Sequence, residues 1–417
     1  MSLLKYTTVA SLLAAAAVLG LQTTTTCPSS PPFVLRQEGF LSAELPTCPD
    51  SHPKIDSHLK IKNHYTPWTH APDCEPATGG KDIYCAYTNS HHGSRGWSIV
   101  TSPEVAADVI GTGYLDAHVN LTRLAGSSFE VVSIEGKGKG VLATRDIKKG
   151  DEILLDYAAL VVDISFTAAV PVNKGYRLLH TAVDRMGDGG NGVMELGKSN
   201  EFAQDVVEDV LRTNAFQMAL GGVPHMAVYP AVSRINHACK PNAYIRFIED
   251  KLQVSVAAAK DIKQGEEITI SYITLGKPSE ERKKNLKQWG FECSCDLCTA
   301  SPAEVQASDN RRKKIEELRD YAIRAFQAGK PYQALRLTRQ VINLLASEEL
   351  FPMYSEQYEN MARIFWVLND MKNAEKYARM SLDILVEQGY IPYVKDEYID
   401  VMWRRFEQEE GPRGERY

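Results

Sequence analysis

Half of the eight cysteines lie far downstream in the chain, with a spacing that is typical of a metal site. Three of them, Cys293, Cys295 and Cys298, form a Cys-x-Cys-x-x-Cys run that offers three thiolates on one short turn. Structural Zn²⁺ takes four ligands, and Cys239 is the other downstream cysteine. The spacing therefore predicts a zinc site that ties Cys239 to the later run. The alternatives are a chance cluster of reduced thiols and, if the chain is secreted, a disulfide within the set.

Three further segments carry side chains that could do chemistry. They are the turn Gly136–Gly140 (Gly-Lys-Gly-Lys-Gly), the pair Asn236-His237, and the segment Gly-Glu-Glu-Ile-Thr-Ile-Ser-Tyr that ends at Tyr272. Taken singly, each has an ordinary explanation: a surface hairpin, a polar turn and a packing aromatic. The glycine-rich turn lacks the strand-to-helix setting of a dinucleotide or P-loop site, so we expect no phosphate binding there. It does offer backbone that a ligand can approach closely.

The segments that must position these residues are rich in β-formers. Short strands are predicted at 129–134, 140–144 and 152–162, and alternation of apolar residues predicts a hairpin from Ala243 to Val256. Ser102 before Pro103 is typical of a helix start. Helical spacing predicts a helix over 201–220, and 163–200, which contains Gly187, Gly189, Gly190 and Gly192, is expected to be an insertion within one fold.

An internal similarity supports one β-rich domain. Residues 143–153 (Ala-Thr-Arg-Asp-Ile-Lys-Lys-Gly-Asp-Glu-Ile) parallel residues 258–268 (Ala-Ala-Lys-Asp-Ile-Lys-Gln-Gly-Glu-Glu-Ile), at an offset of 115 positions that also pairs Tyr157 with Tyr272. Since only two copies exist, they indicate a fold with pseudo-symmetric β units instead of a solenoid.

The chain becomes all-helical after about residue 308. Apolar residues at helical spacing predict five helices, at 309–327, 332–347, 353–369, 372–387 and 394–408. Ala334 and Ala374 occupy like places 40 positions apart, close to the ~34-residue step of tetratricopeptide helix pairs. A tetratricopeptide-like domain and a plain helical bundle are the two interpretations.

The N-terminal region looks secretory. Lys5 precedes an apolar run from Val9 to Leu21, so residues 1–21 have the pattern of a signal peptide; the alternative is a buried or frayed helix. Residues 22–128 form a cysteine-containing extension, mostly irregular up to about residue 65. Its four cysteines, Cys27, Cys48, Cys74 and Cys85, suit two disulfides with three possible connectivities. We therefore expect a secretory or extracellular location, or the nucleus and cytoplasm if the segment is not used.

Composition excludes several classes of protein. Hydrophobic residues make up 44% and charged residues 24%, as in ordinary globular proteins. Lys and Arg total 47 against 53 Asp and Glu, which argues against binding nucleic acid by bulk electrostatics and leaves room for an acidic groove that attracts basic peptides. No run reaches the ~18 apolar residues of a spanning helix, so a multi-pass membrane protein is excluded.

Together, the order of these motifs resembles that of SET-domain protein methyltransferases, most closely the SET-and-MYND subfamily. The resemblance covers about 129–300 and the helical region that follows. It implies S-adenosylmethionine as cofactor, a catalytic tyrosine at Tyr272 and zinc at the four downstream cysteines. The cofactor contacts that it implies are Lys137, Gly138, Asn214, Asn236, His237 and Phe291.

The chain departs from the subfamily pattern in three ways. No cysteine lies between Asp163 and Glu201, so the MYND zinc finger is absent from this stretch. Ala238 stands where the family usually has serine, which removes a hydroxyl and keeps the backbone. The signal-like N-terminus is foreign to intracellular methyltransferases.

The sequence thus predicts an α+β protein: a SET domain over 129–274 with an insertion at about 163–225, a zinc segment over 275–300, and a tetratricopeptide-like all-α domain over 308–417. The resemblance implies methyl transfer to a lysine amine of a protein or peptide. The alternative is a catalytically silent SET-fold scaffold, or a secreted protein, whose helical domain binds peptides.

Overall fold

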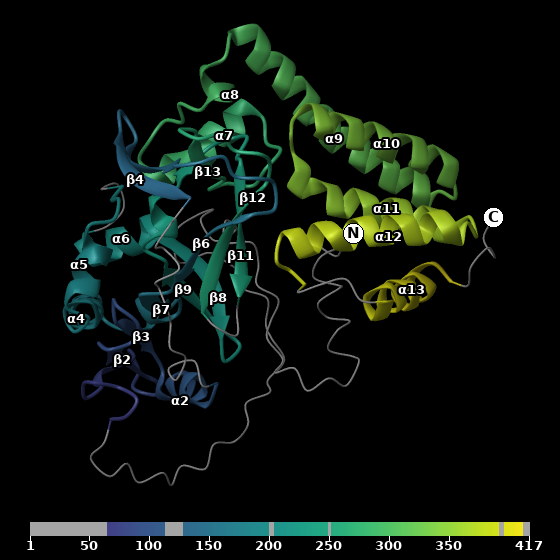
Figure 1. Ribbon diagram of the computed structural model, residues 1–417. Helices are drawn as coiled ribbons and strands as arrows, with labels where there is room; N and C mark the ends of the chain where they lie inside the picture. The colour runs from purple at the N-terminus through teal and green to yellow at the C-terminus, as the bar shows by residue number, and fades with distance from the viewer. Residues whose placement is uncertain (1–64, 113–127, 200–203, 249–251, 392–395, 412–417) are drawn as a thin grey trace.

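The computed structural model describes residues 65–112, 128–199, 204–248, 252–391 and 396–411. Figure 1 shows a β-rich part, coloured purple to teal, beside a set of green and yellow C-terminal helices. No helix within the described ranges is long and apolar enough to cross a membrane. Arg246, in the β-rich part, donates a hydrogen bond to the backbone carbonyl of Glu387 in the helical part, so the two parts are in direct contact.

The largest sheet of the described chain has six strands in the order β1-β2-β3-β7-β9-β8. They are β1 (Asp73–Pro76), β2 (Ile83–Asn89), β3 (Trp97–Thr101), β7 (Leu160–Asp163), β9 (Val223–Val228) and β8 (Ala215–Leu220). All five residues of β3 are buried, and β3 pairs in parallel with β7. The sheet therefore crosses the boundary at residue 129 that the sequence predicts, because the N-terminal strands complete a core that the later segment cannot bury alone.

Cross-strand pairing in this sheet places Cys74 opposite Cys85, and the two form a disulfide. Cys27 and Cys48, the other half of the predicted disulfide set, lie outside the described residues. Helix α2 (Pro103–Gly111) begins as expected, with the Ser102 side chain accepting from the Val105 N–H.

The insertion is helical, and it covers one face of the six-stranded sheet. Its helices are α3 (Phe166–Ala169), α4 (Val172–Asp184), α5 (Asp188–Met194) and α6 (Val206–Asn214). Alternate residues of the strands divide between two cores: Ala86 and Val100 pack with the helices, whereas Tyr87 and Ile99 pack with the smaller sheets. This division is what strand geometry requires, since successive side chains point to opposite faces.

The predicted helix over 201–220 is wrong beyond Asn214. The chain there forms β8, which pairs with β9 from Ala215 to Leu220 around a turn at Gly221 and Gly222. Both glycines have positive φ, 54° and 76°, the conformation that a two-residue hairpin turn requires. The Gly-Gly pair between two apolar runs was the overlooked signal, and strand pairing overrides the helical spacing.

Two smaller sheets hold the motif segments. One has the order β10-β13-β5-β4 and the other β11-β12-β6. Their strands are β4 (Phe129–Ile134), β5 (Gly138–Ala143), β6 (Glu152–Tyr157), β10 (Asn236–His237), β11 (Ala243–Ile248), β12 (Gln253–Ala258) and β13 (Glu267–Ile270). The predicted hairpin is confirmed as β11 and β12. The predicted strand 152–162 divides into β6 and β7, which belong to different sheets.

The internal sequence similarity corresponds to two turns that face each other. The Asp146 carboxylate accepts from the Gln264 N–H at 3.0 Å, and the Asp261 carboxylate accepts from the Lys149 N–H at 2.9 Å. Between them, Ile147 and Ile262 pair in an antiparallel bridge. The expected pseudo-symmetry of the β units is therefore confirmed, because each aspartate fixes the turn of the other copy.

The C-terminal region is helical as expected. Its elements are α7 (Ser279–Leu286), α8 (Asp296–Thr299), α9 (Pro302–Gln327), α10 (Pro331–Ser347), α11 (Tyr354–Val367), α12 (Met371–Glu387) and α13 (Asp396–Glu410). Helix α9 begins before the predicted start at Asp309, because Ser301 and Glu304 form a capping box ahead of it.

Candidate active site and metal site

The Asn236-His237 pair lies on the short strand β10, directly beside β13. The two strands are parallel, with Asn236 opposite Thr269 and His237 opposite Ile270. The Ala238 N–H continues the pairing by donating to the Ile270 carbonyl at 2.9 Å. Two motifs that are about thirty residues apart in the sequence are therefore neighbours in one sheet.

A buried carboxylate fixes the turn that leads into β10. Asp156, only 1% exposed, accepts from the N–H groups of Ala231 and Val232 at 2.7 and 3.1 Å. Its charge is met by an ion pair with Arg95, whose guanidinium lies 4.3 Å from the centroid of the Tyr157 ring. The N-terminal region, through Arg95, therefore supports the Asn-His segment.

Glu267 joins two of the residues that the resemblance assigns to the cofactor. Its carboxylate accepts from the Lys137 ammonium at 2.7 Å and from the Asn236 side-chain amide at 2.9 Å. Gly140 leaves the space for this contact, because a Cβ there would lie 2.7 Å from the Asn236 amide nitrogen. The role of Glu267 was missed in the sequence, although it stands in the Gly-Glu-Glu motif.

The ring of His237 binds the backbone of Tyr272. The Tyr272 N–H donates to His237 Nδ1 at 3.0 Å, so Nδ1 carries no proton and the neutral ring holds its proton at Nε2. Burial lowers the pKa of His237 to about 4, which keeps the ring neutral at physiological pH. Nε2 lies 3.4 Å from the Cys239 sulfur, toward which it donates.

Tyr272 stands at the centre of an aromatic group. Its hydroxyl donates to the Ile235 carbonyl at 2.7 Å, and its ring lies 5.5 Å from His237 and 5.5 Å from Trp289 between centroids. Phe291 packs edge-on against Tyr272 at 6.2 Å and is 36% exposed, so this side of the group borders solvent. Trp289 was not among the expected site residues, although it lies two positions before Phe291.

Asn214 lies at the end of α6, next to the same region. Its side-chain amide donates to the carbonyls of Gly197 and Val210 at 2.7 and 2.8 Å. Its backbone carbonyl accepts from the Ser233 hydroxyl at 3.4 Å, in the turn before β10. The structure therefore connects Asn214 to the Asn-His segment through its backbone.

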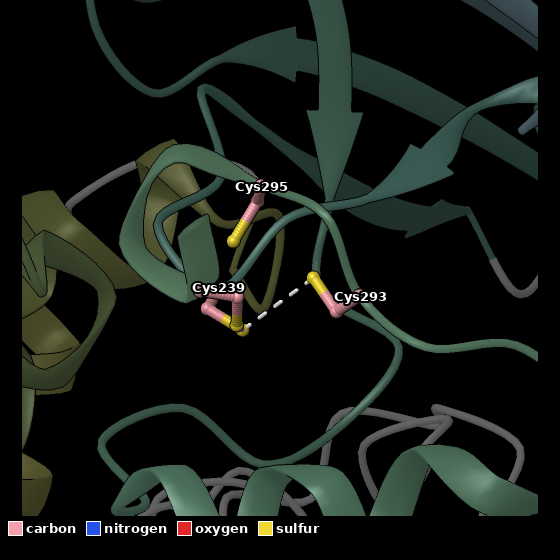
Figure 2. A group of neighbouring side chains, drawn as sticks. Cys239, Cys293 and Cys295 are labelled. Atoms are coloured by element: carbon pink, nitrogen blue, oxygen red, sulfur yellow. Dashed lines mark hydrogen bonds between the residues drawn. The ribbon is translucent and has the colours of Figure 1, made fainter. Parts of the chain in front are cut away.

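The four downstream cysteines converge although Cys239 is distant in sequence. Their sulfur atoms all lie within 4.8 Å of one another, and Figure 2 shows Cys239, Cys293 and Cys295 directed toward a shared space. The Cys239 sulfur is 3.6 Å from that of Cys298 and 3.9 Å from that of Cys293. Zn–S bonds of about 2.3 Å in a tetrahedron place sulfurs about 3.8 Å apart. The donor set and its spacing therefore fit zinc.

The thiols also divide in their acidity. Hydrogen bonding from Cys239 lowers the pKa of Cys298 to about 7, and similar contacts lower the pKa of Cys295. Hydrogen bonding to Cys293 raises the pKa of Cys239. These contacts favour the thiolate form of two of the four cysteines, and thiolate is the form that a metal cation requires of sulfur ligands.

The match to a known protein family covers the middle of this site, which includes Asn214, Asn236, His237 and Tyr272. Residues 177–273 match the model of the SET domain family. Histone-lysine N-methyltransferase set5 of Schizosaccharomyces pombe is 35% identical over 120 residues, which cover 28% of this chain and 38% of that protein. Histone-lysine N-methyltransferase SMYD3 of Homo sapiens is 35% identical over 129 residues, 28% of this chain and 29% of that protein.

A third relative, N-lysine methyltransferase SMYD2-B of Danio rerio, is 28% identical over 130 residues, 30% of each chain. The chain thus spans well under half the length of these three relatives.

The close approach at Gly140 can be tested by stability. Gly140→Ala should lower the free energy of unfolding by about 1–3 kcal/mol, because the added Cβ meets Ile134 and the Asn236 amide and forces them apart. Gly192→Ala is the matched control, since a Cβ there meets no atom within 4 Å. Urea unfolding of the two variants measures the difference, and equal midpoints would contradict the close approach.

Proposed function

Because the chain contains a SET domain related to those of SET5 and SMYD methyltransferases, we propose that it transfers a methyl group from S-adenosylmethionine to a lysine amine of a protein. One observation carries the proposal: the Tyr272 backbone is hydrogen-bonded to the ring of His237, which joins the proposed catalytic and cofactor-binding motifs. A glycine-lysine turn and a thiol cluster border the same segment.

Lys137, Gly138, Asn236 and His237 would bind the methyl donor, with Asn214 at the end of α6 and Phe291 at the rim. The bound donor would supply an activated methyl group on sulfur. The turn fits such a ligand, because Cβ atoms at Gly136 or Gly138 would meet no atom within 4 Å and the backbone is open to approach. Glu267 would hold Lys137 and Asn236 in place for binding.

The aromatic group beside this turn would receive the substrate lysine. A lysine amine with a pKa of ~10.4 is mostly protonated at neutral pH and must lose its proton before attack. The rings of Tyr272 and Trp289 would favour the neutral amine by excluding water, and would align nitrogen with the methyl group. The Tyr272 hydroxyl donates to the Ile235 carbonyl, and its oxygen would act as an acceptor toward the amine and the methyl hydrogens.

Tyr272→Phe should reduce methylation by roughly 100-fold while leaving affinity for S-adenosylmethionine unchanged, because it removes the accepting oxygen and keeps the ring. Transfer of labelled methyl groups to lysine-rich proteins measures the first effect, and calorimetry measures the second. Tyr332→Phe, at an exposed tyrosine of α10, is the control. Full methylation activity in Tyr272→Phe would contradict the catalytic role of the Tyr272 hydroxyl.

Cofactor binding by a wild-type chain that methylates no protein would favour the alternative function, a catalytically silent SET-fold scaffold.

Zinc at Cys239, Cys293, Cys295 and Cys298 is part of the proposal, and its support is the spacing of the sulfurs. Elemental analysis of the purified chain should find one zinc ion, and Cys239→Ser should lose it, because three thiolates remain. The double variant Cys74→Ala/Cys85→Ala should keep it, since that pair forms the separate disulfide. Peptide mapping that finds the four downstream cysteines joined in disulfides would contradict the metal site.

We also propose that residues 1–21 direct the chain into the secretory pathway. The Cys74–Cys85 disulfide supports this location, because disulfides persist in oxidising compartments. A C-terminally tagged chain should be found in that pathway, and deletion of residues 1–21 should leave it in the cytosol or nucleus. Identical distributions of the two forms would contradict the proposal.

A further inference from the structure

Two buried arginines flank the four-cysteine cluster from its helical side. Arg282 on α7 and Arg312 on α9 are each only 1% exposed. A buried guanidinium needs a compensating negative charge, because its desolvation costs several kcal/mol. The partners of these two side chains therefore show what they stabilise.

Arg282 lies against the later part of the cluster. Its Nη2 donates toward the Cys298 sulfur at 3.9 Å, and its Nη1 donates to the Lys277 carbonyl at 2.9 Å. The carboxylate of Asp309 on α9 is 3.6 Å from Nη1 and also accepts from the Ser279 N–H at the start of α7. Helix α9 thus holds the helix that carries Arg282.

Arg312 reaches the earlier part of the cluster. Its Nη2 donates to the backbone carbonyl of Cys239 at 3.5 Å, and its Nη1 donates to the same Lys277 carbonyl at 3.3 Å. Its Nε pairs at 2.8 Å with Glu348, which follows α10 and is fully buried. Ser308 also donates to this carboxylate, at 2.6 Å. Arginines of the C-terminal helices therefore contact the cluster at both Cys239 and Cys298.

The charge of a loaded cluster explains this arrangement. Four thiolates around one Zn²⁺ carry a net charge of −2, which neighbouring cations stabilise where the site is shielded from solvent. We propose that Arg282 and Arg312 are positioning residues that couple metal retention by the four cysteines to the docking of α9 and α10 on the β-rich part. The inference rests on the zinc site of the proposed function. By reciprocity, metal binding should stabilise the docked helices as much as docking stabilises the metal.

A purely structural role for the arginines predicts something different. Buried ion pairs that only stabilise the fold would change the stability of metal-free and metal-loaded chains equally. If the arginines are coupled to the metal, their loss lowers the affinity for zinc. Zinc then stabilises the variants less than it stabilises the wild-type chain. Two measurements therefore separate a purely structural role from coupling: the affinity of each variant for zinc, and the increase in stability that zinc gives to each variant.

The test uses the full chain and competition with a zinc-binding dye. Arg282→Met removes one cation, and the double variant Arg312→Met/Glu348→Gln removes the other together with the charge of its carboxylate partner, which also pairs with Arg311. Each should weaken zinc binding about 10–100-fold, the usual effect of losing an outer-shell partner of a metal ligand. Arg282→Lys should recover part of the loss in Arg282→Met because it keeps the charge. Arg379→Met/Glu375→Gln, an exposed ion pair on α12, is the matched control and should change nothing.

A second measurement needs no variant. Removal of zinc from the wild-type chain should speed hydrogen exchange in α9 and α10 and leave α4 unchanged. Unaltered zinc affinity in both arginine variants, or unaltered exchange in α9 and α10, would overturn the coupling. A wild-type chain that binds no zinc would instead overturn the metal site of the proposed function.

Discussion

The imidazole of His237 joins its own segment, which runs on to Cys239, to the distant segment that ends at Tyr272, and the site depends on that junction. Nδ1 accepts from the Tyr272 backbone, Nε2 faces the Cys239 sulfur, and the neighbouring Asn236 amide is held by Glu267. Because burial keeps the ring neutral, one nitrogen accepts while the other donates. A charged imidazole would have to donate from both nitrogens and would lose the bond to Tyr272.

Buried charges stabilise this junction from two sides. On one side Asp156, paired with Arg95 of the N-terminal region, fixes the turn before β10. On the other, Arg312 of α9 donates to the carbonyl of Cys239 just after β10. Breaking one partner of such a pair costs about 3–5 kcal/mol, so both flanking regions are tied to the site. The N-terminal strands and the C-terminal helices are thus structural parts of the site's framework.

Much of the fold and of the candidate site could be predicted because the signals were local. The Cys-x-Cys-x-x-Cys run and the hairpin of β11 and β12 each fix structure within a few residues, and the paired Asp-Ile-Lys turns are visible as an internal sequence similarity. The helix predicted past Asn214 failed because β8 gains its hydrogen bonds from β9, and helical spacing does not report such pairing. Glu267 and Trp289 were missed because their importance comes from partners that are distant in sequence.

The sequence by itself determined which chemistry is available: four thiols, an Asn-His pair, a glycine-lysine turn and a tyrosine at the end of a strand. Composition and periodicity also determined the β-rich and helical halves. Only the tertiary structure decided that N-terminal strands enter the central sheet, that Glu267 bridges Lys137 and Asn236, and that two arginines meet the cysteines. The physical reason is that a buried charge needs an ion-pair partner and a strand edge needs a hydrogen-bond partner. These partners are distant in the sequence, and no local pattern specifies them.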